Sequence, residues 1–136
     1  MEQELELLFE GKENTSSFRI KEFSPEGAKI EINLRGKISG KVEGLILSTH
    51  EILMKPDRTS EVGIRSIIFS KGEPIFVWGK DTGKIVDPTP TGNIEGKLTF
   101  QTPSQRLAYL NTTKGYTEAV YNIQTGEYTF KVYLVK

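Results

Sequence analysis

GKISGKV at residues 36–42 and GNIEGKL at residues 92–98 share one pattern, G-x-I-x-G-K followed by Val or Leu. In each copy the glycines have the same parity as the apolar residues, so a β-strand would place both kinds on one face. Gly44 continues the glycine spacing of the first copy. A glycine inside a strand is costly unless the strand must bend or another backbone must come close, and inward glycines at intervals let strands coil into a barrel. Surface glycines in loops are the alternative, and we favour the barrel.

Alternation of apolar and polar residues with a period of two is the main pattern in the rest of the chain. It is clearest in four segments: Leu5, Leu7 and Phe9; Ile30, Ile32 and Leu34; Ile94, Leu98 and Phe100; and Tyr128, Phe130, Val132 and Leu134. This period is typical of antiparallel strands with one face in a core and the other in water. Weaker strand patterns occupy residues 17–23, 38–55, 62–69, 74–79 and 115–123. The sequence therefore predicts about eight or nine short strands.

Turn residues separate these segments, and the turn at residues 124–127 joins the last two strands as a hairpin. We expect at most one helical turn, between Ser104 and Asn111, with Ser104 as its cap. The stretch from Gly79 to Gly92 is predicted to be a long loop, either an ordinary hairpin loop or a lid over one mouth of the barrel. The patterns together predict an all-β fold, with a single domain over residues 1–136 and a closed or nearly closed antiparallel β-barrel.

The composition limits the classes of function. Lys plus Arg and Asp plus Glu both total 18, whereas nucleic-acid binding needs a basic excess, so we expect no nucleic-acid partner. No stretch approaches the ~20 apolar residues of a membrane-spanning helix, and the acidic start of the sequence is unlike a signal peptide. We therefore expect a cytoplasmic protein without a membrane partner. The sequence has no cysteine and one histidine, which leaves no thiolate and no imidazole pair for a metal, and we expect no metal or cofactor.

His50 is the first candidate for a functional residue because of its parity. Ser48, Ile52 and Met54 share that parity, so an unbroken strand would point His50 toward the core. One interpretation is a hydrogen-bonded core histidine, and the other is a general base or polar anchor on a cavity wall. A β-bulge between Gly44 and His50 would reverse its direction.

Arg65 is a second candidate because it lies in a strongly apolar segment at residues 62–69. An arginine in such a strand either extends outward or pairs with a buried carboxylate, and Glu118 is the candidate partner. Trp78 and Tyr109 are candidates for lining a ligand cavity, although aromatic residues in small β-domains mostly fill the core.

The order of several short motifs carries a resemblance to a known family. They are GKISGKVEGLIL at 36–47, Pro56-Asp57, the strand–turn–strand from Ile67 to Val77, Phe100-x-Thr102, Tyr109-Leu110-Asn111 and the closing Val132-Tyr133-Leu134-Val135. In this order, residues 36–136 resemble a family of small uncharacterised β-barrel proteins known as a domain of unknown function. The resemblance implies a calycin-like or allene-oxide-cyclase-like barrel. The chain departs from the family at Ser48-Thr49-His50-Glu51, where Gly-Gly-x-Asp-Trp is usual, and at Tyr109, where tryptophan is usual.

Three functions from different classes follow from these patterns. The first is binding of a small, mostly apolar ligand in the barrel interior. The second is an enzyme of isomerase, cyclase or hydrolase type that uses a barrel cavity. The third is a homo-oligomeric or partner-binding scaffold with a filled core. The candidate ligand-binding residues are His50, Arg65, Trp78, Tyr109, Asn111 and Glu118. An eight-stranded barrel is just wide enough either to be filled by side chains or to hold one small ligand, so the sequence leaves the choice open.

Overall fold

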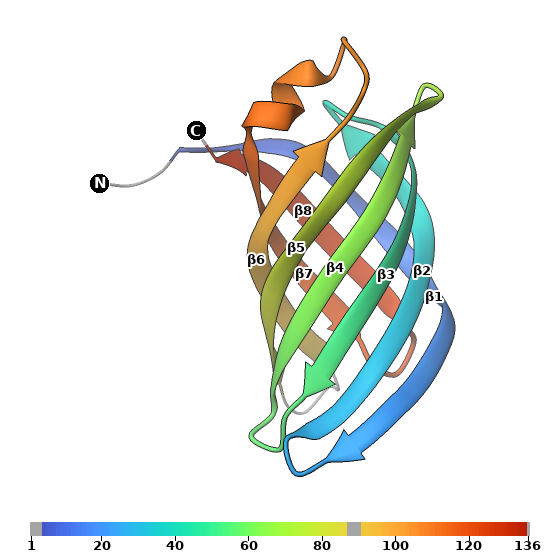
Figure 1. Ribbon diagram of the computed structural model, residues 1–136, viewed down its shortest axis with the longest axis vertical. Coiled ribbons are helices and arrows are strands. Elements are labelled where there is room, and N and C mark those ends of the chain that lie inside the picture. The colour runs from blue at the N-terminus through green and yellow to red at the C-terminus, as the bar shows by residue number, and fades with distance from the viewer. Residues whose placement is uncertain (1–3, 87–90, 136) are drawn as a thin grey trace.

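The computed structural model describes residues 4–86 and 91–135. These residues form eight strands and one short 3₁₀ helix (Figure 1). The elements are β1 (Leu5–Ser24), β2 (Gly27–Gly40), β3 (Gly44–Met54), β4 (Thr59–Ser70), β5 (Glu73–Val86), β6 (Thr91–Gln101), η1 (Ala108–Thr112), β7 (Lys114–Asn122) and β8 (Glu127–Val135). The strands pair antiparallel in chain order, and β1 also pairs with β8, which closes the barrel. The predicted all-β fold and closed antiparallel barrel are confirmed.

The two ends of the barrel are covered differently. The upper end carries the β2–β3, β4–β5 and β6–β7 connections, and the lower end carries the β1–β2, β3–β4 and β7–β8 connections (Figure 1). The segment between β6 and β7, which includes η1, folds over the upper end (Figure 1). Its Leu107 and Leu110 are buried, as is Val42 in the β2–β3 connection. Apolar side chains therefore cover the upper end.

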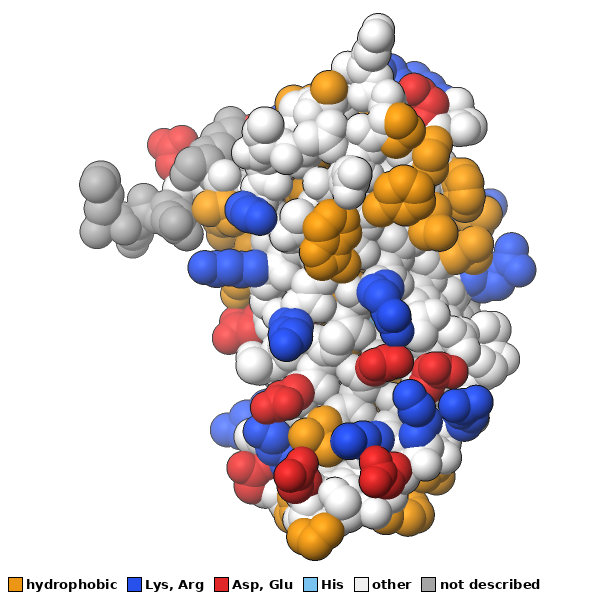
Figure 2. Space-filling model, viewed as in Figure 1, with side chains coloured by type: hydrophobic (Ala, Val, Ile, Leu, Met, Phe, Trp, Pro, Cys, Tyr) orange, Lys and Arg blue, Asp and Glu red, His pale blue; other side chains and the backbone are white. Residues whose placement is uncertain are grey.

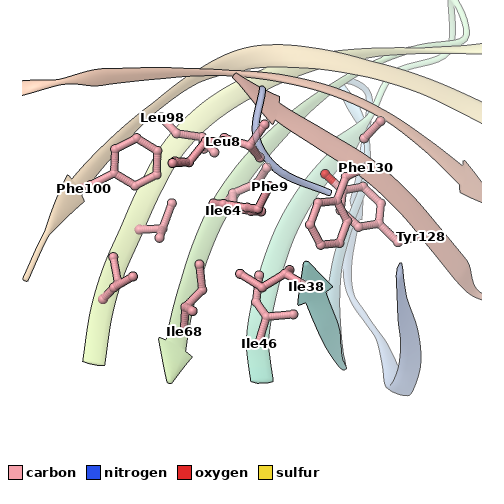
Figure 3. Close-up of a cluster of buried hydrophobic side chains, with 14 of the residues drawn as sticks. Leu8, Phe9, Ile38, Ile46, Ile64, Ile68, Leu98, Phe100, Tyr128 and Phe130 are labelled. Carbon is pink, nitrogen blue, oxygen red and sulfur yellow. The ribbon is translucent and has the colours of Figure 1, made fainter. Parts of the chain in front are cut away.

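The inward residues of all eight strands fill the barrel with mostly apolar side chains (Figure 3). The period of two is confirmed in β2, where Ile30, Ile32 and Leu34 are buried, and in β8, where burial alternates from Tyr128 to Leu134. Burying one side chain of this size stabilises the fold by about 1.5–3 kcal/mol. The interior is therefore the main source of folding free energy.

The start of β1 differs from its predicted phase. The alternation places Leu5, Leu7 and Phe9 on the inner face, but Leu5 and Leu7 are exposed, whereas Leu8 and Phe9 are both buried. The register with β8 shifts between Leu7 and Phe9. An extra residue in one strand reverses the direction of the side chains that precede it, and nothing in the local alternation indicates where it occurs.

Two of the predicted inward glycines, Gly36 and Gly96, lie tightly against neighbouring strands, whereas Gly40 is exposed and a Cβ atom on Gly92 would have no atom within 4 Å. A Cβ atom on Gly36 would lie 1.9 Å from the carbonyl oxygen of Lys12 on β1. A Cβ atom on Gly96 would lie 2.0 Å from Oδ1 of Asp81 on β5. Both distances are far shorter than van der Waals contact. The repeated G-x-I-x-G-K pattern therefore places two strands tightly against their neighbours, as coiling into a barrel requires.

The predicted loop from Gly79 to Gly92 is wrong for most of its length. β5 continues to Val86 and β6 begins at Thr91, and the two strands pair from Phe76–Gln101 to Val86–Thr91. The pairing satisfies the backbone polar groups on both strands, which outweighs the low strand propensity of glycine. Residues 87–90, the remainder of the proposed lid, lie outside the described residues.

The helical turn is confirmed close to its predicted position. The 3₁₀ helix η1 follows a turn in which the Ser104 hydroxyl accepts a hydrogen bond from the backbone N–H of Leu107, at 3.3 Å. Ser104 therefore closes the turn that precedes η1, whereas η1 itself has Leu107 at its N-cap position and no side-chain cap, which differs from the predicted cap at Ser104.

Candidate functional site

Polar side chains from six strands converge inside the barrel, and we call them the inner polar cluster. They are Glu13 on β1, Ser48 and His50 on β3, Ser66 on β4, Asp81 on β5, Thr117 on β7 and Tyr128 on β8, and all are buried. A buried polar group costs free energy unless it is hydrogen-bonded, so several such groups in one small interior need an explanation beyond packing.

Glu13 is the most unusual member of the inner polar cluster. Its side chain is 1% exposed, and its Oε1 accepts a hydrogen bond from the Ser48 hydroxyl at 3.0 Å. Ser48 also shares a hydrogen bond of 2.6 Å with Ser66. Oε2 of Glu13 accepts no hydrogen bond from the described residues. Burial raises the pKa of Glu13 from 4.5 to about 7, against the smaller opposing effect of the Ser48 hydrogen bond.

His50 points into the barrel, as its parity predicts. β3 pairs with β2 and β4 without a register shift, so the bulge that would have reversed His50 does not occur. Its ring lies edge-on to Tyr128, with 4.9 Å between ring centroids. Burial lowers the pKa of His50 to about 4, so the imidazole is neutral near pH 7.

Asp81 and Thr117 lie on either side of Gly96. Gly96 on β6 is opposite Asp81 on β5 and Thr117 on β7. Neither carboxyl oxygen of Asp81 nor the hydroxyl of Thr117 has a hydrogen-bond partner among the described residues. Burial raises the pKa of Asp81 to about 7. Burial also raises the pKa of Tyr128 well above its usual value, with smaller contributions from the carboxylates of Asp81 and Glu13.

A small cavity lies among these groups. Its polar lining residues are Glu13, His50, Ser66, Thr117 and Tyr128, and apolar side chains such as Phe9 and Leu98 form the rest of its wall. Its volume is about 20 Å³, which is room for about one water molecule. The interior is therefore almost filled in this conformation, with its polar groups gathered around a water-sized space.

The described residues hold no cluster of three or more metal-ligating side chains. They also contain no helix that is long and apolar enough to cross a membrane.

Arg65 and Glu118 are not part of this site: of the two interpretations of Arg65 the outward one is confirmed, and Glu118 is not its partner. Arg65 points outward from β4 and donates a hydrogen bond to Glu51 on β3 at 3.1 Å. Glu118 points outward from β7, opposite Glu95 and Lys131. Each has a parity opposite to the inward residues of its own strand. The long arginine side chain reaches water from an apolar segment because every second residue of that segment faces outward.

Trp78 and Tyr109 are half-exposed and lie outside the interior cavity. Trp78 belongs to an apolar patch on the outer face of β3, β4 and β5, where Leu47, Ile67 and Phe76 are in register. Figure 2 shows apolar side chains gathered at the upper right, over these strands. Tyr109 lies on η1.

Asn111 has a structural role in the connection over the upper end. Its Oδ1 accepts a hydrogen bond from the backbone N–H of Thr102 at 2.7 Å, and its Nδ2 donates one to the Thr102 carbonyl at 3.0 Å. The side chain therefore ties η1 to the end of β6, away from the inner polar cluster.

Sequence reasoning identified His50 and missed Glu13 and Asp81. A signal existed for both: Glu13 has the parity of Phe9 and Gly11, and Asp81 has that of Val77 and Gly79. Glu13 lies in a polar stretch and Asp81 in a stretch whose glycines indicate a loop, and both contexts hide the parity.

Comparisons with known proteins agree on the fold. No known protein family matches the sequence, and no curated protein matches it. Among solved structures, a protein of unknown function from Clostridium acetobutylicum has a TM-score of 0.88 at 18% identity, with 100% of this chain and 99% of that chain covered. A β-barrel-like protein from Acinetobacter baumannii has a TM-score of 0.84 at 19% identity, covering 100% and 98%. An enzyme from Penicillium herquei has a TM-score of 0.73 at 18% identity, covering 100% and 96%. These likenesses show the β-barrel fold, shared with proteins of unknown function.

Proposed function

We propose that the barrel interior binds a small, mostly apolar molecule and transfers a proton to or from it, with Glu13 as the general acid–base. The observation that carries this proposal is Oε2 of Glu13, a buried oxygen without a partner among the described residues, on a carboxyl with a pKa of about 7. A general acid–base is most effective when its pKa is near the working pH. Strongly perturbed carboxyls beside an internal cavity are also typical of functional sites.

The neighbours of Glu13 suit this chemistry. Ser48 holds one carboxyl oxygen in place, which leaves the other to accept or donate the proton. His50 and Tyr128, both on the cavity wall, are neutral near pH 7, so they can donate hydrogen bonds to a polar atom of the ligand without adding charge. The apolar wall favours a ligand with few polar atoms. The similarity in fold to an enzyme from Penicillium herquei is consistent with a catalytic use of such a barrel.

A ligand larger than water needs the interior to expand, and the lower end is the side where this is easiest. The upper end is covered by Leu107 and Leu110. At the lower end β1 extends beyond its pairing with β8, and Phe18 and Ile20 remain exposed there. We place the access route at this apolar lower end.

The test is proton exchange on simple carbon acids. The protein is incubated in D₂O with a set of small enolisable ketones, and loss of the α-proton signal is followed by NMR. We expect exchange faster than in buffer, with a rate that rises as Glu13 ionises around pH 7. Glu13→Gln should abolish the enhancement because an amide cannot take the proton. Glu118→Gln, a change to an outward carboxyl, should leave the rate unchanged.

Two outcomes would contradict the proposal. One is an exchange rate no faster than buffer for every ketone, with no shift of the Tyr128 or His50 resonances on adding the compounds. The other is an enhancement that survives in the folded Glu13→Gln variant.

A further inference from the structure

The lower half of β1 has one hydrogen-bonding edge without a partner in the described barrel. β1 pairs with β2 along almost its whole length, from Phe9 to Ser24, but it pairs with β8 only from Leu5 to Asn14. The backbone N–H of Thr15 still donates to the Gly126 carbonyl, and beyond it no described strand borders this edge. Figure 1 shows this part of β1, with β2, projecting past the start of β8. We call residues 16–24 the free edge.

The free edge is also apolar on one face. Phe18, Ile20 and Phe23 face the same way, because their partners on β2 are Ile32, Ile30 and Ala28. Their side chains are 53%, 55% and 75% exposed. An open strand edge is a template for pairing with another chain, and large exposed apolar groups beside it add a driving force for that pairing.

We propose that the free edge pairs antiparallel with the free edge of a second copy of this chain, forming a twofold dimer with a β1–β1 ladder. The residue order supports a second copy because it is self-complementary. With Ile20 opposite Lys21 at the centre, Arg19 faces Glu22, Phe18 faces Phe23 and Ser17 faces Ser24. Twofold symmetry makes each pair occur twice. In one register the dimer thus brings Arg19 twice beside Glu22, which also pairs with Lys29 of its own chain, and Phe18 twice beside Phe23.

The register shifts in β1 fit this arrangement. They lie between Thr15 and Ser17 and between Ile20 and Glu22, so they keep Arg19 and Glu22 on one face and Phe18 and Phe23 on the other. Charges and bulges also discourage open-ended aggregation of an edge strand. In a twofold pair the free edges of both chains are used up by each other, so pairing through this edge stops at two copies.

A charge swap tests the register. Sedimentation velocity from micromolar to millimolar concentration measures the dissociation constant of the wild type, Arg19→Glu, Glu22→Arg and the double variant. Each single variant places like charges opposite each other twice, and cross-strand charge pairs of about 0.2–1 kcal/mol each weaken the dimer by on the order of tenfold. The double variant restores opposite charges and should return to the wild-type value. Arg35→Glu, a change on β2 away from the free edge, is the matched control.

Cysteine cross-linking gives an independent readout, because the chain has no native cysteine. Ser17→Cys and Ser24→Cys, each alone, should not cross-link, whereas a mixture of the two should form a disulfide-linked dimer under mild oxidation. In this register the same position in the two copies is roughly 23 Å apart along the strands, too far for a bridge between two molecules of one variant. A wild type that stays monomeric at millimolar concentration overturns the proposal. A dimer whose dissociation constant is the same in the wild type and the single charge variants overturns it as well. So does a dimer that cross-links through Ser17→Cys alone.

Discussion

Burial gives the ionisable groups of the barrel interior pKa values that keep the interior uncharged over part of the pH range. It raises the pKa of Glu13 and of Asp81 to about 7 and lowers that of His50 to about 4. Between these values the two carboxyls are protonated and the imidazole is neutral. Outside this range the barrel must hold a charge away from water, which is costly.

The first prediction concerns the pH dependence of stability due to Glu13. Its pKa is raised on folding, from 4.5 to about 7, so its contribution to stability is complete below pH 4.5 and is lost as the pH rises to 7. The shift corresponds to a loss on the order of 3 kcal/mol. Glu13→Gln removes this dependence, so its free energy of unfolding should fall less between pH 4 and pH 8 than that of the wild type.

Urea unfolding at the two pH values measures this difference. Glu118→Gln, at an outward position, should keep the wild-type dependence. Equal pH dependence in the wild type and Glu13→Gln would show that Glu13 is ionised in the folded protein without cost.

The second prediction concerns His50. Its pKa is lowered on folding, from 6.5 to about 4, so its contribution to stability is present above pH 6.5 and is lost as the pH falls toward 4. NMR titration of the single imidazole should give a pKa near 4. His50→Ala should cost a few kcal/mol at pH 7, because it leaves a cavity beside Tyr128. A pKa near 6.5 with an unchanged melting temperature would show instead that the ring contacts water.

At the scale of the elements, close packing of β5 against its two neighbours, β4 and β6, depends on glycines that face inward. Gly79 on β5 lies against β6, where a Cβ atom would come within 2.1 Å of the Lys97 carbonyl oxygen, and Gly83 lies against the Ser60 side chain. Both glycines lie in the stretch from Gly79 to Gly92 that the sequence pattern indicates as a loop. The glycines therefore have a packing role rather than a turn role in β5.

The third prediction compares two glycines of β6 that are four residues apart. A Cβ atom on Gly96 would lie 2.7 Å from the Cα atom of Asp81, whereas a Cβ atom on Gly92 would have no atom within 4 Å. Gly96→Ala should cost about 1–3 kcal/mol through overpacking. Gly92→Ala should be neutral or stabilising by about 0.4–1 kcal/mol, because alanine restricts the unfolded chain. Thermal unfolding of both variants measures the difference, and equal effects would contradict the role assigned to the inward glycines.

At the scale of the whole molecule, closure of the barrel makes the stability of each strand depend on the strands beside it. Every strand has two neighbours, and the β1–β8 pairing from Leu5 to Asn14 joins the two ends of the sheet. Removing any strand would break two ladders and expose the common core. Such a structure has few ways to unfold in parts.

The fourth prediction is therefore a single cooperative unfolding transition. Trp78, the only tryptophan, reports on the outer face of β5, and far-ultraviolet circular dichroism reports on all strands. The two transitions in urea should coincide, as two-state unfolding requires. A separate early loss of strand signal, with Trp78 fluorescence unchanged, would show that part of the barrel unfolds alone.

The sequence by itself determined the class of structure and the direction of many side chains. The direction of a side chain in a strand depends on parity, which is a local property. This is why the burial of His50, the alternation in β8 and the inward glycines could all be predicted. Parity also separates Arg65 and Glu118 from the interior, although the apolar residues around Arg65 masked that signal.

Only the tertiary structure decided which inward residues meet. Glu13 lies opposite Tyr128 because of the β1–β8 register. Asp81 lies level with Thr117 because both are paired with Gly96, one from β5 and the other from β7. Registers between strands distant in sequence depend on packing summed over the whole barrel, and one extra residue, as between Leu7 and Phe9, changes them. The inner polar cluster and the free edge of β1 both arise from such long-range pairings, so neither is visible in any single stretch of the chain.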